Sequence, residues 1–135
     1  MKKFILTALA YFISSFVIGY IWHLVFFQEQ YDAFRMFGNM ANPDFLYICI
    51  GTVFESLVFA FLFYKYYDNK SSPHTFGITI GVCLFLFASS YGVFQLAGVE
   101  KIEGSGIGGF IGLEFSYMIL TGILCGLVGG FVNRK

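Results

Sequence analysis

Three ionisable side chains lie inside long apolar stretches of this sequence, and they are its main candidates for chemistry. Glu55 falls near the middle of one stretch, Glu114 lies early in another, and His23 lies near the end of a third. An ionisable group inside a bilayer costs at least about 2.5–3.5 kcal/mol, so each should face other helices and find a partner. Such groups are typical of ligand binding or proton binding, and equally of hydrogen bonds that only hold helices together.

Counting residues from the ends of the stretches places more polar side chains at the depth of His23 and Glu114. We predict that these residues meet in one polar pocket that opens outward, with Glu55 and Thr52 beneath it. The pocket would be formed by His23, Tyr91, Gln95, Glu114 and Tyr117. An alternative stays open, because buried Glu, His and Gln often only bond helices together, and Trp22 suits an anchor at the membrane interface.

The sequence lacks the local signatures of common enzymes and metal sites. It has no H-E-x-x-H, G-x-S-x-G or Walker motif. Cys49, Cys83 and Cys125 lie singly in separate stretches, as small buried hydrophobic residues do. His23 and His74 fall at opposite faces of the membrane, which disfavours a haem held by two histidines. We therefore expect neither a metal nor a cofactor, and we favour a non-enzymatic protein.

The composition places these residues in a membrane protein. Of the 135 residues, 58% are hydrophobic and only 12% are charged, whereas a soluble domain carries about a quarter charged residues. A surface this apolar would aggregate in water, so the surrounding solvent must be lipid. The formal net charge is zero, so we expect the lipid bilayer as a partner and no nucleic acid.

Four apolar segments set the architecture, and they span residues 4–27, 45–67, 75–98 and 107–132. As a helix, each crosses roughly 30 Å of hydrocarbon. Every backbone N–H in hydrocarbon needs a partner within its own segment, and the short alternating segments of a β-barrel are missing. We predict an all-α bundle of four transmembrane helices that forms one domain over residues 1–135. The first segment imitates a signal peptide, but its apolar run is too long for one.

Lysine and arginine are distributed unequally between the two sides of the predicted bundle. Only Arg35 and Lys101 fall on one side. The other side carries Lys2, Lys3, Lys65, Lys70, Arg134 and Lys135. The positive-inside rule therefore predicts a multi-pass protein of the plasma (inner) membrane with both termini and the second loop in the cytoplasm.

The first outer loop, residues 28–44, has a pattern of its own. Tyr31, Phe34, Phe37 and Met40 recur at near-helical spacing between polar residues. This spacing favours a short helix lying on the outer membrane surface. A loop tucked against the bundle is the alternative.

Glycines recur every four residues in the last two segments. Helices associate in lipid through close van der Waals contact, which small residues permit. We predict that helices pack through Gly77, Gly81, Gly92, Gly122, Gly126 and Gly130. Two alternatives stay open. The glycines accept bulky phenylalanines of neighbouring helices within one chain, or those of the fourth segment form the face of a homo-oligomer.

A family resemblance covers most of the chain. The run Trp22–Phe27 followed by Tyr31, together with Pro43, Gly51 and Glu114, resembles a group of small, functionally uncharacterised bacterial four-helix integral membrane proteins. The Ala-Lys pair that follows the third helix in that group is not reproduced, because Ala97 precedes Gly98 here. The resemblance implies the fold and the topology, and it implies no activity.

Two functions fit this sequence. In the first, the protein binds or transports a small or amphipathic ligand, such as a lipid, in the outward-facing polar pocket. In the second, it is a structural or accessory subunit that docks another membrane protein through its glycine-rich helix faces. A cavity that reaches Glu114 favours the first, and a sealed bundle with exposed glycines favours the second.

Overall fold

The computed structural model describes residues 1–33, 45–99 and 106–134, and the side chains of residues 33, 45, 47, 48, 91–99, 106 and 107 lie outside the described part. The described chain is helical and contains no strand. Its elements are α1 (Lys2–Tyr20), η1 (Ile21–Phe26), α2 (Gln28–Ala33), α3 (Phe45–Tyr66), α4 (Pro73–Val99) and α5 (Gly106–Asn133). The all-α prediction is therefore confirmed for the described residues.

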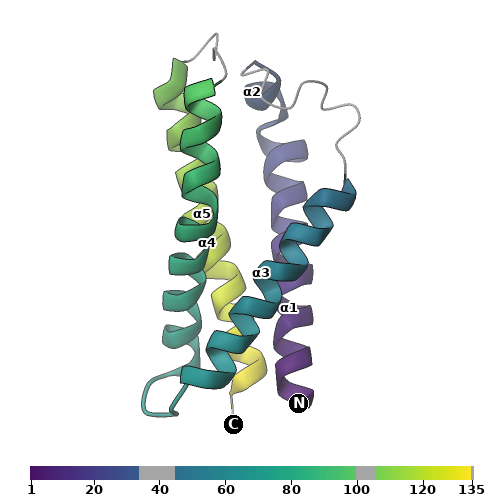
Figure 1. The fold of residues 1–135 in the computed structure, drawn as a ribbon, viewed down its shortest axis with the longest axis vertical. Helices are drawn as coiled ribbons and strands as arrows, with labels where there is room; N and C mark the ends of the chain where they lie inside the picture. Colours follow the sequence, from purple (N-terminus) through teal and green to yellow (C-terminus); the bar gives the residue numbers. More distant parts are fainter. Residues whose placement is uncertain (34–44, 100–105, 135) are drawn as a thin grey trace.

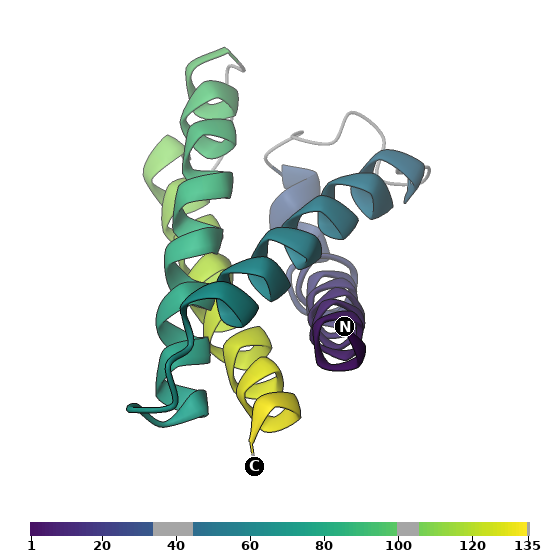
Figure 2. The same ribbon diagram turned by 60° about the horizontal axis from the view of Figure 1, so that its bottom comes forward.

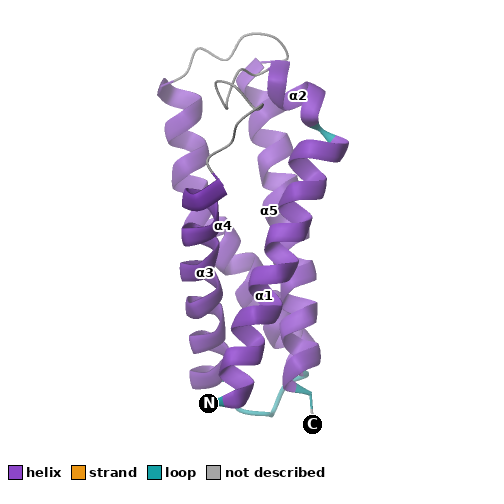
Figure 3. Ribbon diagram, turned by 90° about the vertical axis from the view of Figure 1, so that its right-hand side faces the viewer, coloured by secondary structure: helices purple, strands orange, loops and turns teal. Residues whose placement is uncertain are grey.

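The long helices run up and down, so both termini lie at the same end of the bundle (Figure 1). α4 and α5 lie side by side over most of their length, and α1 packs against both α3 and α5. Figure 2 shows α3 crossing the bundle obliquely, and Figure 3 shows the short helix α2 at the end away from the termini. Among the described residues, four helices are long and apolar enough to cross a membrane: Lys2–Phe26, Cys49–Tyr66, Pro73–Ser90 and Gly108–Asn133.

The α4–α5 contact is made by backbone rather than by side chains. A Cβ atom added at Gly122 would lie 2.6 Å from Val82 Cα, and one at Gly126 would lie 2.5 Å from Ile78 Cα. Side chains at these positions would force the two helices apart, since real Cβ atoms do not approach backbone so closely. The absence of Cβ atoms therefore sets the distance between α4 and α5.

The remaining glycines of this face complete what we call the α4–α5 seam. Gly77 and Gly81 face the backbone of α5 at Gly126 and Gly122, and Gly130 faces the first turn of α4 at His74. Gly92 lies outside the described side-chain positions. Gly108 and Gly112, on the same helix as the seam, have no atom within 4 Å of an added Cβ, so only part of α5 is packed closely.

Aromatic rings from α3 fill the space beside the seam. Phe59 and Phe63 are buried, and a Cβ at Gly129 would lie 2.5 Å from Phe59 Cε1. Phe59 also lies against Tyr11 of α1, with ring centroids 4.5 Å apart. Phe54 and Phe61 are 66% and 52% exposed, so alternate faces of α3 meet the bundle and its surroundings. Glycines that accept a phenylalanine are thus found at Gly129 and at Gly77 of the seam, where an added Cβ would lie 3.2 Å from Phe63 Cε2. The other seam contacts are backbone against backbone.

The first span departs from the single helix expected over residues 4–27. At η1 the chain widens into a π-helical turn, in which the Phe27 N–H donates to Trp22 O at 3.0 Å. Phe27 then leaves helical geometry (φ −125°, ψ 20°), and α2 begins at Gln28. Residues 34–44, which hold Pro43 and the rest of the outer-loop pattern, lie outside the described residues. Tyr31 of α2 is fully buried, so this short helix rests on the bundle.

Candidate functional site

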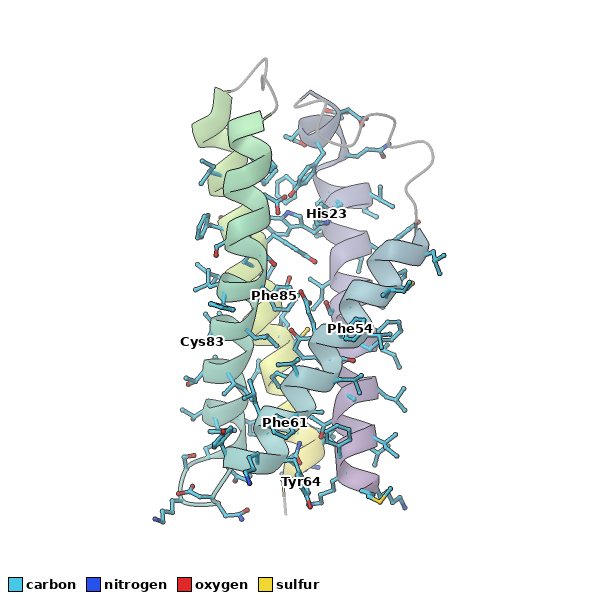
Figure 4. All side chains as sticks on the ribbon, viewed as in Figure 1. His23, Phe54, Phe61, Tyr64, Cys83 and Phe85 are labelled. Carbon is cyan, nitrogen blue, oxygen red and sulfur yellow. The ribbon has the colours of Figure 1, made fainter. Side chains whose placement is uncertain are left out.

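Glu114 is the centre of the polar contacts in the half of the bundle away from the termini. The Tyr31 hydroxyl of α2 donates a hydrogen bond to Glu114 Oε1 of α5. His23 Nε2 of η1 lies 3.6 Å from the same oxygen, within ion-pair range. The Glu114 side chain is only 12% exposed. The neighbouring elements η1 and α2 and the distant helix α5 thus converge on one carboxyl group. Figure 4 labels His23 in this half of the bundle.

The backbone of α1 orients the His23 ring. His23 Nδ1 lies 2.9 Å from the carbonyl oxygen of Gly19, one turn earlier. A carbonyl oxygen can only accept, so Nδ1 carries the hydrogen and donates it. The other ring nitrogen, Nε2, is thereby directed at Glu114. The π-helical turn at η1, a feature that is frequent at functional sites, places Trp22 and His23 in this region.

One additional proton would complete the pairing of donors and acceptors between His23 and Glu114. With Nδ1 protonated, neutral His23 presents a lone pair on Nε2, and an ionised Glu114 presents only acceptors. Two acceptors would then face each other across 3.6 Å. One extra proton, either on His23 to make an ion pair or on Glu114 to make a neutral acid, removes this conflict and keeps the site neutral overall.

Aromatic rings surround the carboxyl and imidazole groups. The His23 ring lies 4.6 Å from the ring of Tyr31 and 4.6 Å, edge-on, from that of Tyr117. The Trp22 ring lies 5.9 Å from that of Tyr117, and Trp22 Nε1–H donates to the Tyr31 hydroxyl at 3.3 Å. Burial, and then the nearby Glu114 carboxyl, raise the pKa of Tyr31 above its usual range, so its hydroxyl remains a donor.

Gly19 makes room for the Tyr117 side chain. A Cβ at Gly19 would lie 3.0 Å from the Tyr117 hydroxyl oxygen, which is tighter than an ordinary van der Waals contact. The same residue supplies the carbonyl that accepts from His23. Gly19 therefore positions both a histidine and a tyrosine of the site.

The structure brings together three of the five residues predicted to form the pocket. His23, Glu114 and Tyr117 lie in one cluster, as the contacts above describe. Glu55 lies on α3, and its described electrostatic neighbours are Tyr11, Tyr117 and Cys125. Tyr91 and Gln95 are in α4, but their side chains lie outside the described part.

Two residues of the site, Trp22 and Tyr31, are not among those that the sequence predicts for the pocket. The sequence pattern indicates only an interface anchor at Trp22 and a surface helix at Tyr31. The place of Trp22 in the site could have been predicted from the sequence, because Trp22 directly precedes His23. Tyr31 follows His23 by eight residues, and only the change of direction at Phe27 folds it back onto Glu114.

Metal binding has no geometric support in the part of the chain that the structure describes. There, no three His, Cys, Asp or Glu side chains lie close enough to hold an ion together. His23 and Glu114 are two such groups, and their neighbours are tyrosine and tryptophan.

Comparisons of the chain with protein-family models, with curated proteins and with solved structures found no match. The geometry of the site is therefore the basis for assigning a function.

Proposed function

We propose that this protein binds a small amphipathic cation inside the membrane, at Glu114, in exchange for a proton. The observation that supports the proposal is the position of the Glu114 carboxyl, which accepts from Tyr31 and faces His23 within a ring of aromatic side chains. An intramembrane carboxyl held in this way suits a binding role better than a purely structural one.

The charge balance of the site selects a cation as the ligand. The site is neutral when His23 and Glu114 share one extra proton, and loss of that proton leaves a carboxylate of low exposure. A positively charged ligand that replaces the proton restores neutrality. An anionic ligand would instead place a second negative charge beside Glu114, which is costly in a medium of low dielectric constant.

The aromatic rings select a cation with apolar substituents. Trp22, Tyr31 and Tyr117 present aromatic surface near the carboxyl group, and aromatic rings attract organic cations through their quadrupoles. The apolar substituents of such a ligand would lie among these rings and the surrounding lipid. Binding would require His23 or Tyr31 to shift, because their rings now pack against each other at 4.6 Å.

The binding test compares two ions of the same shape and opposite charge. Purified protein in mild detergent is titrated with tetraphenylphosphonium and, separately, with tetraphenylborate. We expect the cation to bind, to bind more tightly as pH rises because protons compete with it, and to release protons into a weakly buffered solution. Equal binding of both ions, or cation binding that weakens as pH rises, would contradict the proposal.

We also propose that the site opens to the outside of the plasma (inner) membrane and that both termini are cytoplasmic. The support is the excess of lysine and arginine at the end that carries the termini. In a variant lacking native cysteines, a cysteine at position 103 should react with an impermeant label from outside, and one at position 70 only after lysis. The reverse pattern would place the site on the cytoplasmic side.

The second candidate function, docking of another membrane protein, has narrower support. The seam glycines already contact each other within the chain, so a partner could not use them without separating α4 from α5. The small residues of α5 that are exposed include Gly108, Gly109, Gly112 and Ser116. Loss of a co-purifying partner in Gly112→Leu, with the isolated chain still folded, would favour this function over ligand binding.

A further inference from the structure

A second group of polar side chains lies in the interior of the bundle, away from Glu114. Tyr11 of α1 and Thr121 of α5 are both fully buried. Neither the Tyr11 hydroxyl nor Thr121 Oγ1 has a hydrogen-bond partner among the described residues. Inside a bilayer no bulk solvent can satisfy such groups, so a buried hydroxyl without a partner requires an explanation.

The two hydroxyl-bearing residues belong to one neighbourhood. Cys125, one turn from Thr121 on α5, contacts the Tyr11 carbonyl oxygen at 4.0 Å through its sulfur. The Tyr11 ring is 6.0 Å from that of Phe85, which in turn is 6.2 Å from Tyr117. Tyr117 lies close to Thr121 without meeting hydrogen-bond geometry. Tyr11, Thr121 and Cys125 thus lie where α1 packs against α5, with the rings of Phe85 and Tyr117 nearby.

Glu55 adds a carboxyl group to this neighbourhood from α3. It precedes Phe59 by one helical turn, and Phe59 packs on the Tyr11 ring at 4.5 Å. Among the described residues, the titratable groups that interact with Glu55 are Tyr11 from α1 and Tyr117 and Cys125 from α5. None of these groups is a cation, so Glu55 has no described counter-ion here.

We propose that Tyr11, Thr121 and Glu55 form a second polar site, which binds a water molecule in the interior of the bundle and a proton on Glu55. A buried water is stable where it finds two to four polar partners, and two hydroxyls and a carboxyl supply three. A proton that arrives on this water passes to the Glu55 carboxylate and leaves a neutral water behind. The site stands on its own contacts and does not depend on cation binding at Glu114.

The arrangement also suggests where the proton comes from. Tyr117 lies one turn from Thr121 on α5 and close to Glu114 on the same helix, and it interacts electrostatically with both Glu55 and Glu114. Tyr117 is therefore a described neighbour of both carboxyl groups. Intramembrane chains of carboxyl and hydroxyl groups are typical of proton relays, so the proposal includes a proton path from Glu114 past Tyr117 to Glu55.

Whether a water molecule is bound at this site can be tested by the direction in which removal of a hydroxyl changes the thermal stability. Tyr11→Phe and Thr121→Val each remove a hydroxyl with almost no change of shape. If the site is dry, each removes an unsatisfied polar group and should raise the melting temperature in detergent. If water is bound, each removes one of its partners, and we expect the melting temperature to fall. A rise in both variants would overturn the proposal.

Radiolytic labelling gives an independent readout. Hydroxyl radicals generated from a bound water oxidise the ring beside it, so we expect Tyr11 to be oxidised although it is buried. Phe63, which is 2% exposed, is the dry reference within the same core. Labelling of Tyr11 should be lost in Thr121→Val and kept in Glu114→Gln. Equal protection of Tyr11 and Phe63 in the unaltered protein would contradict a bound water.

The proton on Glu55 is tested by infrared spectroscopy. The unaltered protein should show a protonated-carboxyl band that shifts in D₂O and is missing from Glu55→Gln but present in Glu114→Gln. Absence of any difference between the unaltered protein and Glu55→Gln would show that Glu55 is ionised.

A metal cation in place of the water is tested by thermal unfolding. A melting temperature that rises with Na⁺ but not with choline, and no longer rises in Glu55→Gln, would show such a cation. Either this result or an ionised Glu55 would overturn the proposal.

Discussion

Near the termini, α4 and α5 meet backbone to backbone, whereas toward the other end η1 and α2 meet α5 through polar and aromatic side chains. In the α4–α5 seam the contacts at Gly122 and Gly126 leave no space for a single Cβ atom. Around Glu114 the contacts are a hydrogen bond from Tyr31, an ion-pair distance to His23 and ring packing. The seam fixes the distance between α4 and α5, whereas the cluster contains groups that can exchange protons and hydrogen-bond partners. The difference separates what holds the fold from what is available for function.

The largest effect should come from filling the seam. In Gly126→Leu the new side chain would collide with the backbone at Ile78, so the two helices must separate. Overpacking typically costs about 1–3 kcal/mol, and rigid backbone on both sides favours the upper end. We expect the melting temperature in detergent to fall by about 10 °C.

The matched control lies on the same helix. Gly112 has nothing within 4 Å of an added Cβ, so Gly112→Leu should change the melting temperature little. Equal losses in the two variants would mean that helix propensity, rather than contact between α4 and α5, governs the effect of glycine here.

The next effect should appear in binding rather than in stability. Glu114→Gln keeps the shape of the side chain and can still accept from Tyr31, but it removes the charge. We expect the fold to survive, tetraphenylphosphonium affinity to fall by at least about tenfold, and its pH dependence to disappear. Glu29→Gln, at an exposed position of α2, is the control and should bind normally. If Glu114→Gln binds as tightly as the unaltered protein, the carboxyl is only structural.

Removal of the Tyr31 hydroxyl should give a smaller effect on both properties. Tyr31→Phe keeps the buried ring but deletes the donor to Glu114 and the acceptor for Trp22. A hydrogen bond to a charged group contributes about 1.5–3 kcal/mol, and one between neutral groups about 0.5–1.5 kcal/mol. The loss of stability, measured by thermal unfolding, therefore also reports the charge of Glu114. Tyr66→Phe, at an exposed tyrosine, should be neutral.

The smallest effect concerns alkaline pH. Burial and the Glu114 carboxyl raise the pKa of Tyr31 in the folded protein, whereas in the unfolded chain tyrosine ionises near pH 10 or so. Above that pH the unfolded state holds fewer protons, so stability falls as pH rises. We expect the melting temperature to drop as pH rises above about 10, and to drop less in Tyr31→Phe. An identical slope in both proteins would mean that Tyr31 ionises freely when folded.

The candidate site was only partly predictable from the sequence. Ionisable residues in hydrocarbon must find partners, so His23 and Glu114 were expected to meet on energetic grounds alone. Tyr31 was not, because its position depends on the break in helix geometry at Phe27, which no glycine or proline marks. Glu55 was placed beneath the pocket by depth, but depth does not reveal which neighbours it faces, and these include Tyr11 and Cys125.

The number and type of the spans follow from the sequence by itself. Long apolar segments in lipid must satisfy their own backbone hydrogen bonds, and this leaves the helix as the solution whatever the neighbours are. The rotation of each helix about its axis was decided only by the tertiary structure. Gly112 and Gly126 have the same chemistry and similar spacing to other small residues, yet one faces outward and the other touches Ile78. Rotation depends on contacts between distant segments, and those contacts leave no local periodic signal, because all sides of a helix in lipid can be apolar.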